Sequence, residues 1–229
     1  IGYRGDNLTS ATGTDPQTIL AAEGTTDVNA NQSTPNTFTT GGVTEFQLAD
    51  PTIALSGSGT ADAPYIQIHL NTTGFQNIQV AYNLRDLDAS TDNAIQPVAL
   101  QYRLGSSGNF TNVPAAFVAD ATSGPSLATQ AIPVSVILPA AADNQAQLEL
   151  RIMTTNAAGN DEWVGIDDIV ISGNGTGGGS NSPISTSCPA TTIAQGTAGS
   201  VVLTATDTDS RVNAATLAAG TPVAFSLGT

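Results

Sequence analysis

The sequence has no lysine and only one histidine, so its positive charge comes from five arginines among 229 residues. Against these stand 19 aspartates and glutamates, which give a formal net charge of -14. Nucleic-acid-binding proteins take much of their affinity from clustered lysine and arginine. The composition therefore excludes nucleic acid as a partner of this chain.

Long hydrophobic runs and paired cysteines are missing as well. No apolar stretch reaches the roughly 18 to 20 residues that cross a bilayer as a helix, so we expect no membrane span. The single cysteine, Cys188, has no partner for an internal disulfide. Packing, bound ions or neighbouring chains must therefore stabilise the protein.

The residues that most enzyme chemistry needs are scarce. With one histidine and one cysteine, the chain offers no Ser-His-Asp set and no zinc-ligand cluster, and it has no glycine-rich phosphate loop. A glycosidase that uses only carboxylates stays open, although no two carboxylates stand out as acid and nucleophile. We therefore predict that the chain is not an enzyme, with His69 as a surface residue.

The sequence does contain a two-residue alternation of apolar and polar side chains, in one segment after another. This period is typical of strands with one buried and one solvated face, and the turn residues between the segments favour a sandwich. We predict an all-β fold, an antiparallel two-sheet jelly-roll-like sandwich over residues 1–173. Its strands are expected at 65–71, 77–84, 98–104, 134–138, 148–152 and 163–172, with edge strands near 18–22 and 43–48.

The end of the chain has a different composition. Residues 174–183 are rich in Gly, Ser and Asn and predict a linker. Residues 184–229, in which Val201, Leu203 and Ala205 alternate with other residues, predict a partial Ig-like or cadherin-like β segment. A piece of two or three strands buries too little surface to offset the entropy of ordering it. We therefore expect that the natural chain continues or that this segment completes its sheet against another molecule.

The segment 86–93 is a candidate Ca²⁺ site. Asp86, Asp88 and Asp92 offer carboxylates at even spacing, which lets one loop wrap a hard cation. The alternative is a solvated connection between strands, with Arg85 paired to a carboxylate.

Asp167 and Asp168 form a second acidic candidate, in the last predicted strand of the sandwich. Alternation predicts that they point to opposite faces, so one carboxylate lies inward and needs a partner. A Ca²⁺ ion shared with an N-terminal acidic residue such as Glu23 would supply that partner. An arginine or a ring of backbone N–H groups would serve equally well.

Aromatic residues make up only 5% of the chain, which limits the candidates for a sugar-stacking platform. Trp163 is one, although its place at the head of a core strand favours packing in the interior. Tyr3, Tyr65 and Tyr82 are others, and the last two also fit core faces.

Four stretches together resemble the non-catalytic N-terminal module of large secreted bacterial proteins: APYIQIHLNTTGFQNIQVAYNLRDLDAS, DNAIQPVALQYRLG, SGNFTNVPAAFVADAT and LRIMTTNAAGNDEWVGIDDIVISG. Some of those proteins are extracellular nucleases with a C-terminal endonuclease/exonuclease/phosphatase domain. The stretch SCPATTIAQGTAGSVVLTATDTDS resembles the start of the Ig-like or cadherin-like segment that follows the module there.

The resemblance implies a secreted jelly-roll-like module, similar to MAM and carbohydrate-binding domains. In such domains an aspartate of the last-strand Ile-Asp-Asp-Ile motif helps to hold a structural cation, and Asp167 or Asp168 occupies that place. No catalytic residue carries over to this chain.

The leading hypothesis is a non-enzymatic, extracellular bacterial surface or matrix module for adhesion or assembly, stabilised by Ca²⁺. Its orphan strands would be completed by an adjacent subunit in a fibre, that is, by self-association through β-edges. One alternative is the targeting portion of a larger secreted nuclease or phosphatase, and another is a glycan-binding module.

Overall fold

The structure is a computed structural model that describes residues 2–4, 8, 10–22, 34–35, 41–57, 61–87, 94–122, 131–159, 161–176, 185–187 and 204–206. The chain divides into two compact units, Ile1–Asn174 and Gly175–Thr229.

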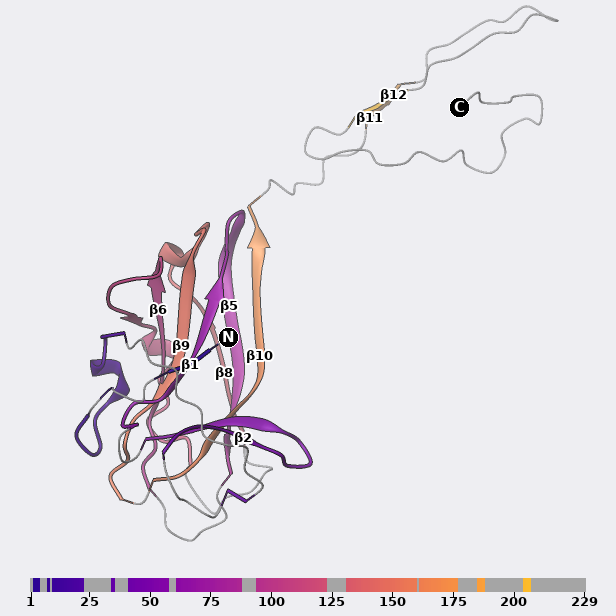
Figure 1. The fold of residues 1–229 in the computed structure, drawn as a ribbon. Coiled ribbons are helices and arrows are strands. Elements are labelled where there is room, and N and C mark those ends of the chain that lie inside the picture. The colour runs from indigo at the N-terminus through magenta and orange to yellow at the C-terminus, as the bar shows by residue number, and fades with distance from the viewer. Residues whose placement is uncertain are drawn as a thin grey trace, which may run out of the picture. The chain divides into compact units, whose positions relative to one another are not determined.

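The first unit is a sandwich of two five-stranded sheets (Figure 1). Sheet A has the order β1 (Gly2–Arg4), β4 (Tyr65–Leu70), β9 (Leu148–Thr154), β6 (Val98–Leu104), β7 (Thr111–Asn112). Sheet B has the order β2 (Gly42–Phe46), β3 (Thr52–Ser56), β10 (Val164–Gly175), β5 (Phe75–Asp86), β8 (Ala131–Ile137). Neighbouring strands run antiparallel in the pairs whose register is resolved. The predicted all-β antiparallel sandwich is confirmed.

The apolar positions of the alternating strands meet between the sheets. Ile66, Leu100, Leu150 and Ile152 of sheet A and Leu84 of sheet B are all at most 1% exposed and belong to one core cluster. A second cluster joins Phe46, Ala54, Leu87 and Trp163, in which the Phe46 and Trp163 rings meet edge to face at 5.4 Å. The expectation that Trp163 packs in the interior is confirmed.

The N-terminal edge strand predicted near residues 18–22 is wrong. The chain there forms the short 3-10 turn η1 (Pro16–Thr18) and then runs without regular structure. Asp15 caps the turn, because its side chain accepts a hydrogen bond from the Gln17 N–H, and Pro16 has the fixed φ that suits the first position. The backbone carbonyls that follow bind side chains of sheet A instead of a strand.

Two further short turns, η2 (Pro114–Ala116) and η3 (Ala140–Ala142), connect strands of the sandwich. None of the helices in the described residues is long and apolar enough to span a membrane. In the second unit, β11 (Ser185–Ser187) and β12 (Thr204–Thr206) pair antiparallel as a two-stranded sheet.

Candidate functional site

The first acidic candidate lies only partly within the described residues. Asp86 ends β5 and is 1% exposed. Asp88 and Asp92 lie outside the described residues, so a Ca²⁺ site that they share with Asp86 stays a prediction. Glu23, expected to share an ion with Asp167 or Asp168, also lies outside them, so that site stays a prediction too. Within the part of the chain that the structure describes, no group of three His, Cys, Asp or Glu side chains is placed to hold a metal ion.

Asp167 and Asp168 lie where β10 changes its alternation. Ile166 and Ile169 both pack in the main core although they are three residues apart, so one residue between them is accommodated as a bulge. Asp168 takes the left-handed conformation there, with a φ of 52°, a region that aspartate tolerates better than most residues. The bulge keeps both carboxylates out of the core, and the prediction of opposite faces was wrong.

Arg85 is the partner that Asp167 requires. Its Nη1 lies 2.6 Å from Asp167 Oδ2 and 3.2 Å from Asp50 Oδ2, and its own side chain is only 5% exposed. Asp168 instead accepts a hydrogen bond of 2.8 Å from the Asn83 side chain. The sequence allows a Ca²⁺ ion, an arginine or backbone N–H groups as partners of the inward carboxylate, and at Asp167 the structure shows the arginine.

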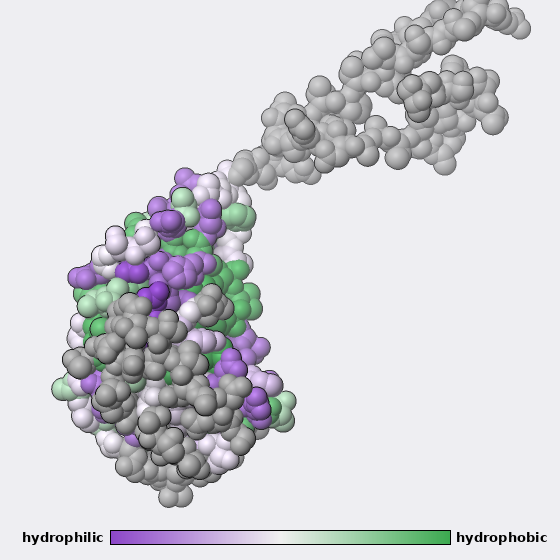
Figure 2. Space-filling view, in the orientation of Figure 1, coloured by the Kyte–Doolittle hydropathy of each residue, from purple (hydrophilic) through white to green (hydrophobic). Residues whose placement is uncertain are grey.

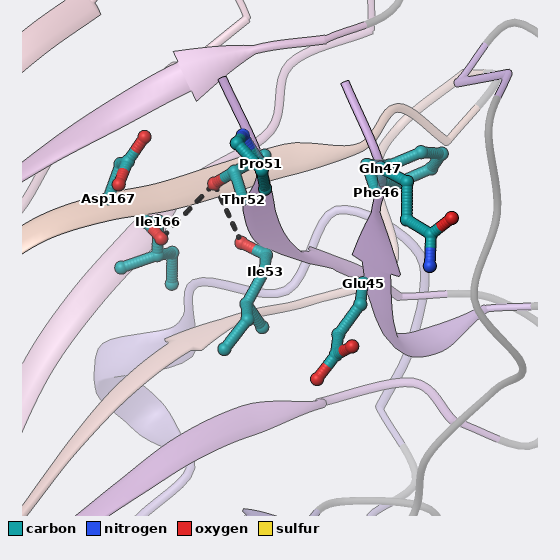
Figure 3. Close-up of a pocket in the computed structure, with 8 residues that line it drawn as sticks. All are labelled: Glu45, Phe46, Gln47, Pro51, Thr52, Ile53, Ile166 and Asp167. Atoms are coloured by element: carbon teal, nitrogen blue, oxygen red, sulfur yellow. Dashed lines mark hydrogen bonds between the residues drawn. The ribbon is translucent and has the colours of Figure 1, made fainter. Parts of the chain in front are cut away.

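A pocket of about 240 Å³ opens beside this strand (Figure 3), and its lining residues come from β2, β3, β10 and the β2–β3 turn: Glu45, Phe46, Gln47, Pro51, Thr52, Ile53, Ile166 and Asp167. Figure 3 shows the Glu45 and Asp167 carboxylates pointing away from each other. Since Asp167 is also paired with Arg85, the pocket does not present the two facing carboxylates that a glycosidase uses.

The aromatic residues considered for sugar stacking are mostly interior. Tyr65, Tyr82 and Trp163 are at most 2% exposed, and only Tyr3, on the edge strand β1, is half-buried. Burial, and secondarily the charge of Glu45, raise the pKa of the Tyr3 hydroxyl. Among the described residues these positions form no open aromatic platform.

The outer face of sheet A carries polar rows that sequence reasoning treated as ordinary solvated positions. Strand register places Gln67, Arg151, Gln101 and Asn112 side by side across four strands. The next row toward the β4–β5 turn contains His69, Glu149 and Arg103. We call these two rows the polar face. The available signal was that two successive outward positions are polar on each of three neighbouring strands, β4, β9 and β6, with two of the five arginines among them.

Residues 10–22, which we call the N-terminal arm, are tied to one row of the polar face. Arg151 is fully buried and donates hydrogen bonds to the Ile19 and Ala21 carbonyls. Its guanidinium lies 4.0 Å from the centre of the Phe110 ring and 4.9 Å from that of Tyr65, so it makes cation–π contacts with two rings that themselves meet edge to face. Burial lowers the pKa of Arg151 to about 10. This row is a structural tie between the arm and the sheet.

The other row centres on a buried carboxylate. Glu149 accepts hydrogen bonds from Arg103 Nε at 2.6 Å and from Gln67 Nε2 at 2.8 Å. Its second oxygen lies 3.1 Å from His69 Nδ1. The Glu149 side chain is 5% exposed, whereas that of His69 is 55% exposed. His69 therefore stands on the surface as expected, held in place by a buried network that was not expected.

The edges of the sheets offer the remaining candidate surface. β3 pairs with β10 only at Val164, Gly165 and Ile166, so the later part of β10 is bonded to β5 alone among the described strands. A second cavity of about 410 Å³ lies beside it, lined by Leu70, Asn71, Thr72, Phe75, Ile78, Ile171, Ser172 and Gly173. Figure 2 shows hydrophobic residues gathered where Figure 1 draws β10 and β5.

Comparisons with known proteins give distant likenesses in fold. No protein-family model and no curated protein matches the sequence. A solved structure of carbohydrate-binding modules from the β-sandwich superfamily is similar over 58% of this chain and 53% of its own, at 9% identity and a TM-score of 0.38. This chain thus spans about half the length of that protein.

Two other solved structures show likenesses of the same order. One is a carbohydrate-binding module specific for non-crystalline cellulose, with 12% identity, a TM-score of 0.35, and coverage of 57% of this chain and 81% of that one. The other is tailspike protein 4 of bacteriophage CBA120, with 10% identity, a TM-score of 0.35, and coverage of 58% and 18%. Likenesses this distant carry no argument about ligands.

Proposed function

We propose that this chain is a non-catalytic, extracellular module for adhesion or assembly, in which strands of one copy are completed by strands of another. The observation that carries the proposal is that the strands described in the second unit, β11 and β12, have three residues each and form a two-stranded sheet. An isolated two-stranded hairpin is marginally stable in water. A second copy that extends this sheet would supply the missing hydrogen bonds and buried area.

Composition supports the same proposal. The chain has no lysine and only 10% charged residues, and charged side chains, lysine above all, are what native proteins use to keep strand edges apart. The sequence resembles modules of secreted bacterial proteins, and we found in it no set of residues suited to catalysis. Both observations favour a surface or matrix role.

The test is the mass of the intact chain in solution as its concentration is raised. Light scattering after size-exclusion chromatography is expected to show species that grow beyond a dimer, and electron microscopy is expected to show filaments. A chain that stays monomeric over the whole concentration range would contradict the proposal.

Glycan binding is a second candidate, and the row of His69, Glu149 and Arg103 is the observation that favours it. Fixed donors and acceptors with one exposed member suit the recognition of hydroxyl groups. On a glycan array, His69→Ala is expected to lose signal that the wild type shows. Gln79→Ala, on the exposed face of sheet B, is the matched control. An array without hits for the wild type would remove this candidate.

The third candidate, the targeting portion of a secreted nuclease or phosphatase, is supported only by the resemblance described above. The full gene product would decide it, because such a protein contains further metal-binding His and Asp residues in a separate domain.

A further inference from the structure

The later part of β10 forms a sheet edge with few residues that would prevent another strand from pairing with it. From Asp168 to Gly175 it has β5 on one side and no described strand on the other (Figure 1). The only charged residue in this stretch is Asp168, at its beginning, and it contains neither Lys nor Pro. Unpaired N–H and C=O groups of such an edge form a template for another strand.

Among the described strands, the outermost strand at each of the other sheet edges is either very short or carries a residue that discourages pairing. β8 has Pro133 in its middle, and β2 carries Glu45 on the same side of the strand as the core residue Val43. Proline and inward charges on edge strands both oppose association. β1 and β7 are only three and two residues long, and the stretch of β4 left uncovered by β1 is Ile68–Leu70.

The cavity beside the open edge is apolar where an added strand would face it. Leu70, Phe75, Ile78 and Ile171 contribute to its lining, and Phe75 is 46% exposed. Val170, on the edge itself, is 59% exposed. At Gly173 a Cβ atom would lie 2.8 Å from Ile78 Cδ1, so the edge strand packs against β5 here because it has no side chain. A strand paired to β10 would place alternate side chains over this cavity.

On this basis, and resting on the assembly function proposed above, we infer that the open edge of β10 and its adjoining cavity receive residues 200–206 of a second copy. This segment, SVVLTAT, has no charged residue and alternates Val201, Leu203 and Ala205 on one side. Its seven residues span about 23 Å at roughly 3.3 Å per residue, which is one residue less than the open edge from Asp168 to Gly175.

Charge supports the choice of this occupant. In a chain of net charge -14, two copies repel each other over most of their surfaces, and the repulsion is least where two uncharged strands meet. β12 pairs with β11 on one side and would join β10 through its other side. Because donor and acceptor are different surfaces, the contact is heterologous and repeats from copy to copy.

Three variants of the full chain test this arrangement. Val170→Lys places a charge on the acceptor edge, and Leu203→Asp places one in the donor segment. Ile137→Lys is the matched control, since Ile137 is 63% exposed on the edge strand β8. Circular dichroism and melting temperature establish that each variant is folded like the wild type.

We expect wild type and Ile137→Lys to form open-ended species, and each of the other two variants to lose them and run as monomers. A 1:1 mixture of Val170→Lys and Leu203→Asp is expected to form dimers that grow no further, because it retains one intact edge and one intact donor strand per pair. Mass photometry of the mixture measures this directly.

The other outcomes overturn the inference in distinguishable ways. If Leu203→Asp still dimerises while Val170→Lys does not, two β10 edges pair with each other. If the wild type assembles and Val170→Lys assembles equally well, the acceptor lies elsewhere and the assembly function stands. A monomeric wild type removes the proposed function together with this inference.

Discussion

Buried charged side chains in this protein are paired with charged partners that lie far from them in the sequence. Arg85 and Asp167 are separated by 82 positions, and Arg103 and Glu149 by 46. Removing one member of such a pair leaves an uncompensated charge in the interior, which costs more than the pair itself contributes. The buried ion pair of the polar face, Arg103 with Glu149, therefore contributes to the stability of the protein.

Replacing Glu149 with alanine tests this at a single residue. We expect the free energy of unfolding to fall by about 3 kcal/mol, because Arg103, with a side chain only 9% exposed, loses its carboxylate. His69→Ala removes the exposed partner of the same carboxylate and is expected to cost less than about 1 kcal/mol. Urea unfolding measures both, and equal losses would show that the buried pair has no special weight.

The burial of Tyr82 predicts that the stability of the protein falls at alkaline pH. Burial raises the pKa of its hydroxyl, so above about pH 10 the unfolded chain loses a proton that the folded chain keeps. The folded state then binds more protons than the unfolded state, and stability falls as the pH rises.

Tyr82→Phe is therefore expected to reduce the loss of stability above about pH 10. At neutral pH it should leave stability unchanged or raise it by about 1 kcal/mol, because the Tyr82 hydroxyl has no hydrogen-bond partner among the described residues. Melting curves at neutral and alkaline pH give both quantities, and an unchanged alkaline slope would contradict the assignment.

At the scale of the elements, two places depart from a simple strand. One is the bulge at Asp168, where the alternation of β10 shifts by a residue. The other is Gly57, which forms a parallel bridge with Asn156 after β3 ends. Neither the left-handed conformation of Asp168 nor the contact between Gly57 and Asn156 can be predicted from the alternation of apolar and polar residues in the sequence.

Gly57→Ala tests the second of these places. A Cβ atom there would lie 2.3 Å from the Asn156 backbone nitrogen and 2.8 Å from the Asp62 carbonyl oxygen. Since backbone atoms cannot move aside as a side chain can, we expect a loss of about 2 kcal/mol or more. Gly2→Ala, with nothing within 4 Å of its added atom, is the control. Similar melting temperatures for the two variants would contradict this account.

At the scale of the whole molecule, Ca²⁺ stabilisation stays a prediction, with Asp86 buried at the end of β5. A ligand bound only by the folded state stabilises it by mass action, about 2.7 kcal/mol at 100 times its dissociation constant. EDTA is then expected to lower the melting temperature by about 5 °C or more. Adding Ca²⁺ back should restore it.

A variant with Asp88 and Asp92 both changed to asparagine provides the control, and it should respond less to EDTA than the wild type. If the melting temperature is the same with and without EDTA, no stabilising cation is bound at either residues 86–92 or residues 167–168.

Most of the strands were predictable from sequence, because a period of two residues is a local property. The segments around Ile66, Ile78, Leu100 and Leu150 show it clearly, and each forms a strand. The prediction failed near residues 18–22, where the backbone carbonyls bind Arg151 instead of pairing in a sheet. It also failed at Asp167 and Asp168, since alternation cannot reveal a residue that takes a left-handed conformation.

The amino-acid sequence by itself determined that this protein is built of strands, is strongly acidic and has few residues suited to catalysis, since period and composition need no fold to be read. Only the tertiary structure decided which polar residues meet. Register across β4, β9 and β6 brings His69, Glu149 and Arg103 together. Because β3 begins only at Thr52, the later part of β10 has no strand on that side among the described residues. Both depend on which strands become neighbours, and that is set by packing between sheets.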